Sequence, residues 1–223
     1  MAQRSNPVDI AAIYRILRDQ FHRHHMPVVD LIEAQTRDPF KVLVSTILSA
    51  RTKDQTTAEA SRRLFGRVGG AGDLRRLPVD AIEHLIYPVG FYKNKARFLK
   101  ELPDRLDELF EGRVPDTVEE LIRLPGVGRK TANLVVAIGF RKPAVCVDVH
   151  VHRICNRLGY VCTKTPFETE MKLREILPAK YWLMINSFLV SFGQHLCFPV
   201  NPRCGGCPIR RYCSRVGVRT KYA

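Results

Sequence analysis

The chain has 223 residues, of which 45% are hydrophobic, so it can bury one large core or two modest ones. Lys and Arg number 36 against 22 Asp and Glu, which gives a formal net charge of +14. An excess of this size predicts attraction to a polyanion, either nucleic acid or an anionic membrane surface, while a merely soluble basic protein is the simpler alternative.

Two classes of protein are disfavoured by the sequence. The N-terminus lacks the apolar core of a secretory signal peptide, and no stretch is long enough to span a bilayer. We therefore expect an intracellular, soluble protein that does not bind a membrane. In that compartment seven cysteines are more typical of thiols or metal ligands than of disulfides.

Helical patterns follow one another along nearly the whole chain. The first covers residues 8–24, and Asp38 before Pro39 marks the start of the next as an N-cap with a first-turn proline. Further helices are expected over 53–66, 79–87, 93–111, 117–123, 129–139, 149–158, 167–176 and 180–194. The one strand candidate, 143–149, has no evident partner, so the predicted fold class is all-α.

The stretch LPGVGRKTANLVV, residues 124–136, forms the turn between two of these helices. Gly126 and Gly128 allow close approach to their backbone, and the N–H groups of the turn and the following helix start suit a phosphate oxygen. A plain helix connector is the alternative. In a chain of charge +14, the pattern is similar to the helix-hairpin-helix of DNA-repair glycosylases.

Lys130 stands in the first turn of that second helix, where cations are electrostatically disfavoured. One interpretation is a further phosphate contact on a basic helix end. The other is chemical: the positive helix start and Arg129 would lower the pKa of the lysine, giving a neutral amine that can form a Schiff base.

Asp148 is the candidate acid–base partner, because it is the only charged residue of an apolar run that begins at Ala144. The alternative is that Asp148 is the N-cap of the helix over 149–158, a common role of aspartate. A residue in that role can still take part in catalysis. His150 is a weaker candidate, since a histidine beside a helix start is more often structural than catalytic.

Four cysteines are arranged as Cys-x6-Cys-x2-Cys-x5-Cys, within residues 197–213, namely Cys197, Cys204, Cys207 and Cys213. Four thiolates in one compact loop indicate a metal centre, either zinc or an iron–sulfur cluster. The spacing alone does not choose between them, and zinc is the default. The other three cysteines lack this spacing and are expected to be buried thiols. The residues after 201 carry six bases and no acid: Arg203, Arg210, Arg211, Arg215, Arg219 and Lys221.

Taken together, the chain resembles the endonuclease III family of DNA glycosylases with AP-lyase activity. The matching segments are LVSTILSARTKD (43–54), VGFYKNKA (89–96), LPGVGRKTANLVV (124–136), VDVHVHRICNR (147–157) and the four-cysteine loop. The resemblance implies two helical lobes with a DNA cleft between them: a six-helix barrel domain over 32–142, and a domain built from 1–31 and 143–223. It also implies Lys130 as nucleophile, Asp148 as essential carboxylate, and a [4Fe–4S] cluster on the four cysteines.

The resemblance further implies residues that contact double-stranded DNA. Arg51, Val89 and Phe91 match the positions that fill the gap left by an extruded nucleotide, and Arg51 replaces the glutamine usual in the bacterial enzymes, which puts the opposite-base preference in doubt. Gly126, Gly128, Arg203, Arg210 and Arg211 are expected to hold phosphates.

The expected activity is base excision repair: removal of oxidised pyrimidines from damaged duplexes through a lysine imine, followed by β-elimination, by a cytoplasmic, nucleoid-associated monomer. One alternative is a monofunctional mismatch glycosylase of the same superfamily, against which Lys130 argues. The other is a non-catalytic nucleic-acid-binding metal protein, which would have no need for Lys130 and Asp148 together.

Overall fold

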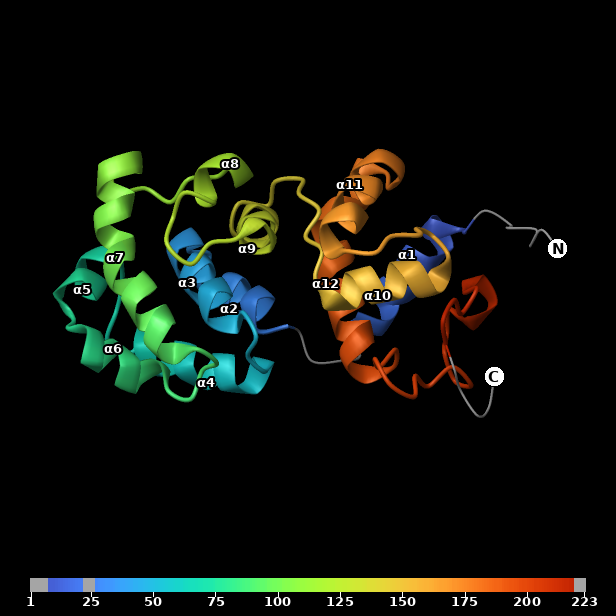
Figure 1. The fold of residues 1–223 in the computed structure, drawn as a ribbon, viewed down its shortest axis with the longest axis horizontal. Coiled ribbons are helices and arrows are strands. Elements are labelled where there is room, and N and C mark those ends of the chain that lie inside the picture. The colour runs from blue at the N-terminus through green and yellow to red at the C-terminus, as the bar shows by residue number, and fades with distance from the viewer. Residues whose placement is uncertain (1–7, 22–26, 219–223) are drawn as a thin grey trace. The chain divides into compact units, whose positions relative to one another are not determined.

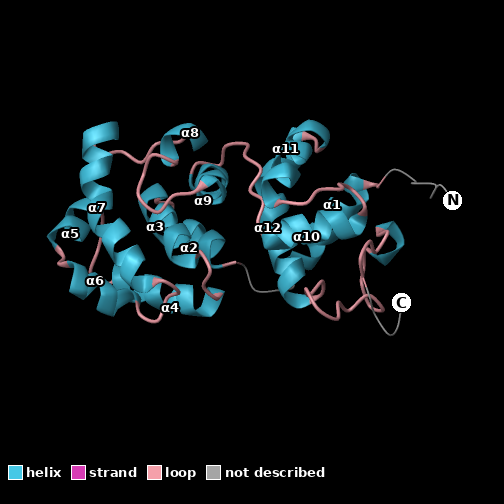
Figure 2. Ribbon diagram, viewed as in Figure 1, coloured by secondary structure: helices cyan, strands magenta, loops and turns pink. Residues whose placement is uncertain are grey.

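The computed structural model describes residues 8–21 and 27–218. Over these residues the chain consists of helices joined by loops and turns, and contains no strand (Figure 2). The all-α prediction is therefore confirmed. Within the same residues, no helix combines the length and apolar character that crossing a membrane requires.

The chain divides into two compact units. Residues 27–144 form one, here called the central unit, and the other, the terminal unit, combines the chain before residue 27 with the chain from residue 145 onward. Sequence reasoning placed these boundaries at 32 and 142. The first boundary differs because residues from 28 onward already belong to a helix, α2, that packs on the next helix of the central unit.

The central unit is built around a helix that is apolar on almost every side. This helix, α3 (Pro39–Ser49), begins at the cap Asp38, whose carboxylate accepts the N–H of Phe40, and buries every residue from Val42 to Leu48. A helix that is apolar all round must be covered by others. It contacts α2 (Val28–Thr36), α4 (Asp54–Phe65), α7 (Tyr92–Phe110) and α9 (Arg129–Leu134). The unit also holds α5 (Ala71–Arg76), α6 (Val79–Ile86), α8 (Val118–Leu121) and a π-helical turn, Val135–Gly139.

The terminal unit brings the two ends of the chain together. Its helices are α1 (Ile10–Phe21), α10 (Val149–Leu158), α11 (Pro166–Ile176) and α12 (Trp182–His195), with 3-10 turns at Ala179–Tyr181 and Arg210–Tyr212. In Figure 1 the N-terminal helix α1 lies beside α12, and the two helices pack together. Their shared core includes Ile13 and Leu17 of α1 and Leu189 of α12.

Several elements differ from those expected. Helices α2 and α5 were not anticipated, and residues 22–24 of the first expected helix lie outside the described residues. The strand candidate 143–149 is not a strand: Ala144 to Val147 are buried in loop conformation, so their apolar character serves packing rather than pairing. The helix expected over 129–139 is α9 continued by the π-helical turn.

Candidate functional site

The hairpin between α8 and α9 turns its apolar residues inward and its glycines outward. Thr117 caps α8: its Oγ1 accepts the N–H of Glu120 and its hydroxyl donates to the Glu120 carboxylate over 2.7 Å. In the turn that follows, Leu124 and Val127 are buried, whereas Gly126 and Gly128 are exposed. The backbone at these two glycines is therefore open to a ligand.

The structure constrains the two glycines differently. Gly126 has a φ of +74°, and a Cβ there would lie 2.7 Å from the ring of Phe98. The fold itself thus requires glycine at position 126. Gly128 has a φ of −90°, and a Cβ there would meet nothing within 4 Å. Neither the backbone conformation nor a steric contact requires glycine at position 128.

Lys130 is exposed in the first turn of α9, two residues after Gly128. The residues that follow it, Thr131 to Leu134, are buried in the central unit. The amide of Asn133 donates to the carbonyl of Arg129 over 3.0 Å, inside this first turn. The lysine therefore projects from the open side of a helix whose other side is anchored in the core.

Asp148 belongs to the terminal unit and is the N-cap of α10. Its Oδ1 accepts the N–H groups of His150 and Val151 at 2.8 and 3.0 Å. The approach to this cap is fixed, because Val147 is buried and the amide of Asn186 donates to the carbonyl of Cys146. The interpretation as a helix cap is correct, and it holds the carboxylate at a defined place.

The residues expected to enter the duplex lie on two neighbouring loops of the central unit. Arg51 and Phe91 are exposed, and the guanidinium carbon of Arg51 is 5.5 Å from the centre of the Phe91 ring, a cation–π distance. Val89 differs from the expectation: its side chain is only 1% exposed. It packs beneath the loop and offers no side-chain surface to DNA.

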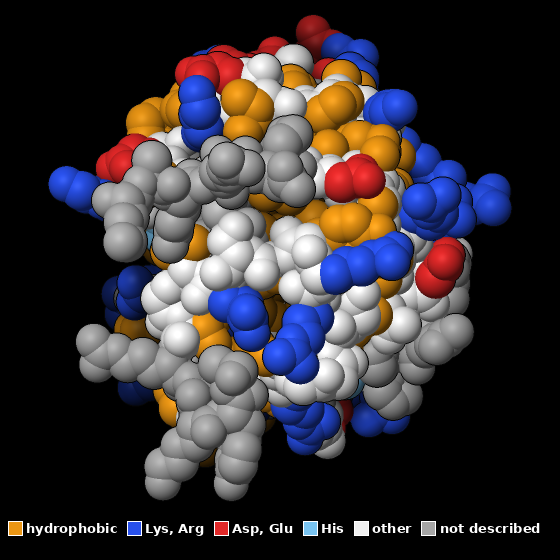
Figure 3. Space-filling model, turned by 90° about the vertical axis from the view of Figure 1, so that its right-hand side faces the viewer, with side chains coloured by type: hydrophobic (Ala, Val, Ile, Leu, Met, Phe, Trp, Pro, Cys, Tyr) orange, Lys and Arg blue, Asp and Glu red, His pale blue; other side chains and the backbone are white. Residues whose placement is uncertain are grey.

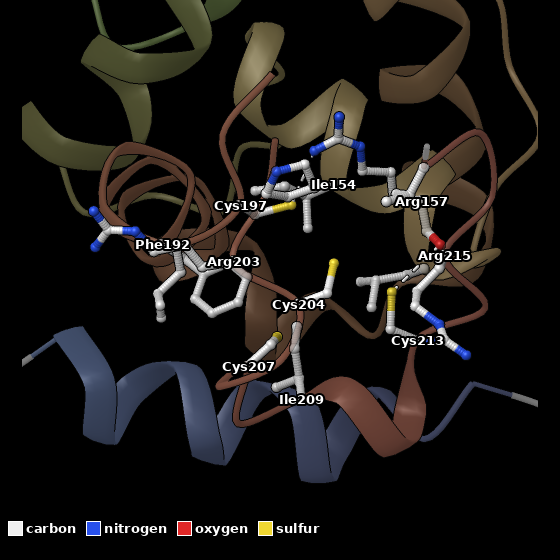
Figure 4. Close-up of a pocket in the computed structure, with 14 residues that line it drawn as sticks. Ile154, Arg157, Phe192, Cys197, Arg203, Cys204, Cys207, Ile209, Cys213 and Arg215 are labelled. Atoms are coloured by element: carbon white, nitrogen blue, oxygen red, sulfur yellow. Dashed lines mark hydrogen bonds between the residues drawn. The ribbon is translucent and has the colours of Figure 1, made fainter. Parts of the chain in front are cut away.

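The four cysteines of the 197–213 loop line one small cavity, which opens partly to solvent. Figure 4 shows their sulfur atoms turned toward this shared space. Within the described residues no three ligands come close enough together to hold a single metal ion. Burial raises the pKa of Cys207 to about 11, and the neighbouring Cys213, Cys197 and Cys204 thiols add to the increase. Of the other cysteines, Cys146 and Cys155 are buried as expected, but Cys162 is exposed.

Two arginines of α10 bind the start of the cysteine loop, and sequence reasoning gave neither a role. Arg157 donates to Cys197 Sγ over 3.3 Å and to the carbonyls of Phe198 and Pro199 over 2.6 and 2.7 Å. Arg153 donates to the Cys197 carbonyl over 2.8 Å and lies 3.1 Å from His150 Nδ1. The available signal was their spacing of four residues, which puts both on one side of α10.

The basic residues of the loop are accessible. Arg203, Arg210 and Arg211 are exposed, whereas Arg219 and Lys221 lie outside the described residues. Arg203 stacks on Phe198 and Arg211 on Tyr212, with guanidinium-to-ring distances of 5.2 and 4.7 Å. In the view of Figure 3, Lys and Arg side chains are spread over the surface and Asp and Glu side chains are few.

Comparison with known proteins agrees with this geometry. Residues 44–179 match the HhH-GPD superfamily of base excision DNA repair proteins. The chain is 48% identical over 176 residues to endonuclease III of Thermotoga maritima, covering 79% of this chain and 83% of that protein. It is 44% identical over 177 residues to the mouse endonuclease III-like protein 1, covering 78% of this chain but 59% of that longer protein.

The fold is similar to those of solved endonuclease III–DNA complexes. One is a non-covalent complex and another is a trapped covalent intermediate, each with a TM-score of 0.82 and 33% identity, covering 92% of this chain and 94% of theirs. The chain therefore belongs to the endonuclease III family, whose place in the HhH-GPD superfamily makes it a base excision repair DNA glycosylase.

Proposed function

We propose that the enzyme excises oxidised pyrimidines from duplex DNA with Lys130 as nucleophile, and that it then cuts the strand as an AP lyase, acting as a monomer. The observation that carries this proposal is the exposed Lys130 placed directly after an exposed glycine turn. Backbone N–H groups at such a turn hold phosphates without reading bases. They would therefore bring the deoxyribose of the bound strand close to the lysine.

The chemistry requires the target nucleotide to leave the base stack, at a cost of roughly a few kcal/mol. The amine nitrogen of Lys130 attacks C1′, and the glycosidic bond breaks with its electron pair leaving on the base. Ring opening gives an imine between Nζ and C1′. Loss of a proton from C2′ then expels the 3′ phosphate by β-elimination, and water releases the lysine.

Asp148 is proposed to supply the negative charge that these reaction steps need. A carboxylate can accept the proton that Lys130 loses on attack and can stabilise positive charge developing on the sugar. Both cap hydrogen bonds go to Oδ1, so Oδ2 is not used by the cap. One carboxylate can therefore position the helix and take part in the reaction.

A [4Fe–4S] cluster is the proposed cofactor of the cysteine loop. A single zinc ion needs four sulfurs at about 2.3 Å from one point, whereas a four-iron cluster gives each thiolate its own iron. Four cysteines that line one cavity can supply the four thiolates of such a cluster, and membership of the endonuclease III family favours the cluster over zinc. When bound, the cluster would supply fixed anchors for the loop, which presents Arg203, Arg210 and Arg211.

The cluster proposal predicts the metal content of the purified protein. Protein prepared without oxygen should be brown, absorb visible light and contain about four irons per chain, as expected for a four-thiolate cluster. Cys204→Ala should lower the iron content, whereas Cys162→Ala, a change at an exposed cysteine outside the loop, should leave it unchanged. A colourless protein with one zinc per chain would contradict the assignment.

Substrate range is tested directly with duplexes that each carry one defined lesion. The proposal expects release of oxidised pyrimidines, cleavage of preformed abasic sites, and loss of both in Lys130→Gln. A mismatch-specific glycosylase would instead release a normal thymine and leave the abasic strand intact. A protein that bound every duplex and released no base would fit the non-catalytic alternative.

A further inference from the structure

The two side chains proposed to enter the duplex share an uncommon backbone conformation. Arg51 has a φ of +54° and Phe91 a φ of +58°. Outside glycine, left-handed conformations cost on the order of 1 kcal/mol or more each and persist only where neighbouring contacts impose them. The contacts that impose them here are specific.

The two loops meet backbone to backbone. The N–H of Gly90 donates to Thr52 Oγ1 over 3.1 Å, and a Cβ on Gly90 would lie 2.6 Å from the carbonyl oxygen of Arg51. A side chain at position 90 would therefore push the loops apart. Because Gly90 has no side chain, Phe91 can lie directly beside Arg51.

Lys95, near the start of α7, forms hydrogen bonds with the loop that carries Arg51. It is only 5% exposed, and its Nζ donates to the carbonyls of Leu48 and Ala50 over 2.8 and 2.6 Å and to Thr52 Oγ1 over 3.3 Å. These acceptors flank Arg51 on both sides. They include carbonyls at the C-terminal end of α3, where a cation is electrostatically favoured.

We propose that Lys95 is a positioning residue that holds Arg51 beside Phe91 and thereby sets how fast the enzyme extrudes a paired, damaged nucleotide. The proposal rests on the function proposed above, since extrusion matters only to an enzyme that acts on a base outside the stack. Lys95 itself touches neither DNA nor the reacting atoms; it acts through the loop that carries Arg51.

The protonation of Lys95 agrees with this role. Burial lowers its pKa from the ordinary 10.5 to about 8, so the ammonium form still predominates at neutral pH. An ammonium has three N–H groups, and the site offers three acceptors. Every donor of the buried cation is therefore used on the segment that carries Arg51.

The test compares two lysines of the same helix. Lys95→Met keeps most of the length of the side chain and removes its three donors. Lys100→Met is the matched control: Lys100 also lies on α7 and donates to two carbonyls, those of Arg75 and Leu77 over 2.6 and 3.0 Å, but contacts neither loop. Thr52→Val, which removes the acceptor shared by Lys95 and Gly90, is a second variant should Lys95→Met fold poorly.

Single-turnover excision is measured with each enzyme on the same lesion in two duplexes, one with the lesion paired and one with it in an unpaired bulge. We expect Lys95→Met to slow excision of the paired lesion on the order of tenfold, as loss of charged hydrogen bonds predicts, and to act almost normally on the bulge. Thr52→Val should show the same pattern more weakly, and Lys100→Met should match wild type on both duplexes.

Three results would overturn the proposal. One is an unchanged rate constant on the paired lesion. The second is an equal slowing on both duplexes, and the third is a lower fraction of active enzyme with normal rate constants. The last two would assign Lys95 to packing alone. Failure of the proposed nucleophile is detected separately: wild-type enzyme would then form no borohydride-trapped complex, or the trapped lysine would not be Lys130.

Discussion

At the scale of single residues, Asp148 combines a structural role with a proposed chemical one. Its Oδ1 accepts two backbone N–H groups at the start of α10, while the proposed proton transfer and charge stabilisation need only a carboxylate with a free oxygen. Asparagine caps helices about as well as aspartate, whereas alanine does not. Substitution can therefore separate the two roles.

Asp148→Asn should abolish most excision while leaving the thermal stability nearly unchanged, because the cap survives and the negative charge does not. Asp148→Ala should lose activity equally and also lose about 1 kcal/mol of unfolding free energy, the usual cost of removing a cap. Thermal unfolding followed by circular dichroism, beside single-turnover excision, measures both. Substantial activity in Asp148→Asn would reduce the residue to a helix cap.

At the scale of elements, the hairpin before Lys130 contains two glycines that look equivalent in sequence and differ in the structure. Gly126 is held by its left-handed backbone and by the nearby Phe98 ring. Gly128 has an ordinary backbone and open space beside it, so the fold would accept a side chain there. The proposed phosphate contact supplies the missing reason, because a phosphate close to the backbone excludes a Cβ.

The two alanine variants should therefore behave differently. Gly126→Ala should destabilise the protein by about 1 kcal/mol or more through strain at positive φ. Gly128→Ala should cost less, roughly 0.5 kcal/mol of unfolding free energy, because glycine is preferred to alanine at an N-cap, and it should still weaken binding to duplex DNA. Denaturant unfolding and DNA titration of both variants test this. Normal DNA affinity in Gly128→Ala would contradict the phosphate contact.

Elements with a local signal could be predicted from the sequence, and those without one could not. The caps at Asp38, Thr117 and Asp148 mark α3, α8 and α10 correctly. Helices α2 and α5 begin after Pro27 and Gly70 without a side-chain cap, so only tertiary packing defines them. The same holds for Lys95: its role depends on carbonyls that lie far away in the sequence, and the chain around it shows only a lysine on an amphipathic helix.

At the scale of the whole molecule, the charge of +14 and the exposed arginines of the cysteine loop predict binding dominated by phosphate contacts. Charge of this kind raises affinity for any duplex and carries no preference for a lesion. We therefore predict that preference for a damaged base comes from the proposed site residues: Lys130, Asp148 and the Arg51–Phe91 pair. The dependence of affinity on salt concentration separates the phosphate contacts from the preference for a damaged base.

Arg210→Ala should weaken binding to intact and lesion-bearing duplexes alike, and it should flatten the plot of log affinity against log salt by up to about one unit of slope. Arg105→Ala removes the same charge from a side chain already paired with Glu108 on α7, and serves as the control. Titrations of both duplexes at several salt concentrations give the slopes. An unchanged slope in Arg210→Ala would remove that residue from the DNA interface.

The central claim is that Lys130 forms the covalent bond with DNA, and peptide mapping of the trapped complex tests it most directly. Wild-type enzyme is reduced with borohydride during turnover on a lesion-bearing duplex, digested, and the modified peptide is identified by mass spectrometry. The account predicts a single modified lysine, Lys130, and no trapped complex in Lys130→Gln. Modification at another lysine, or equal trapping in that variant, would contradict it.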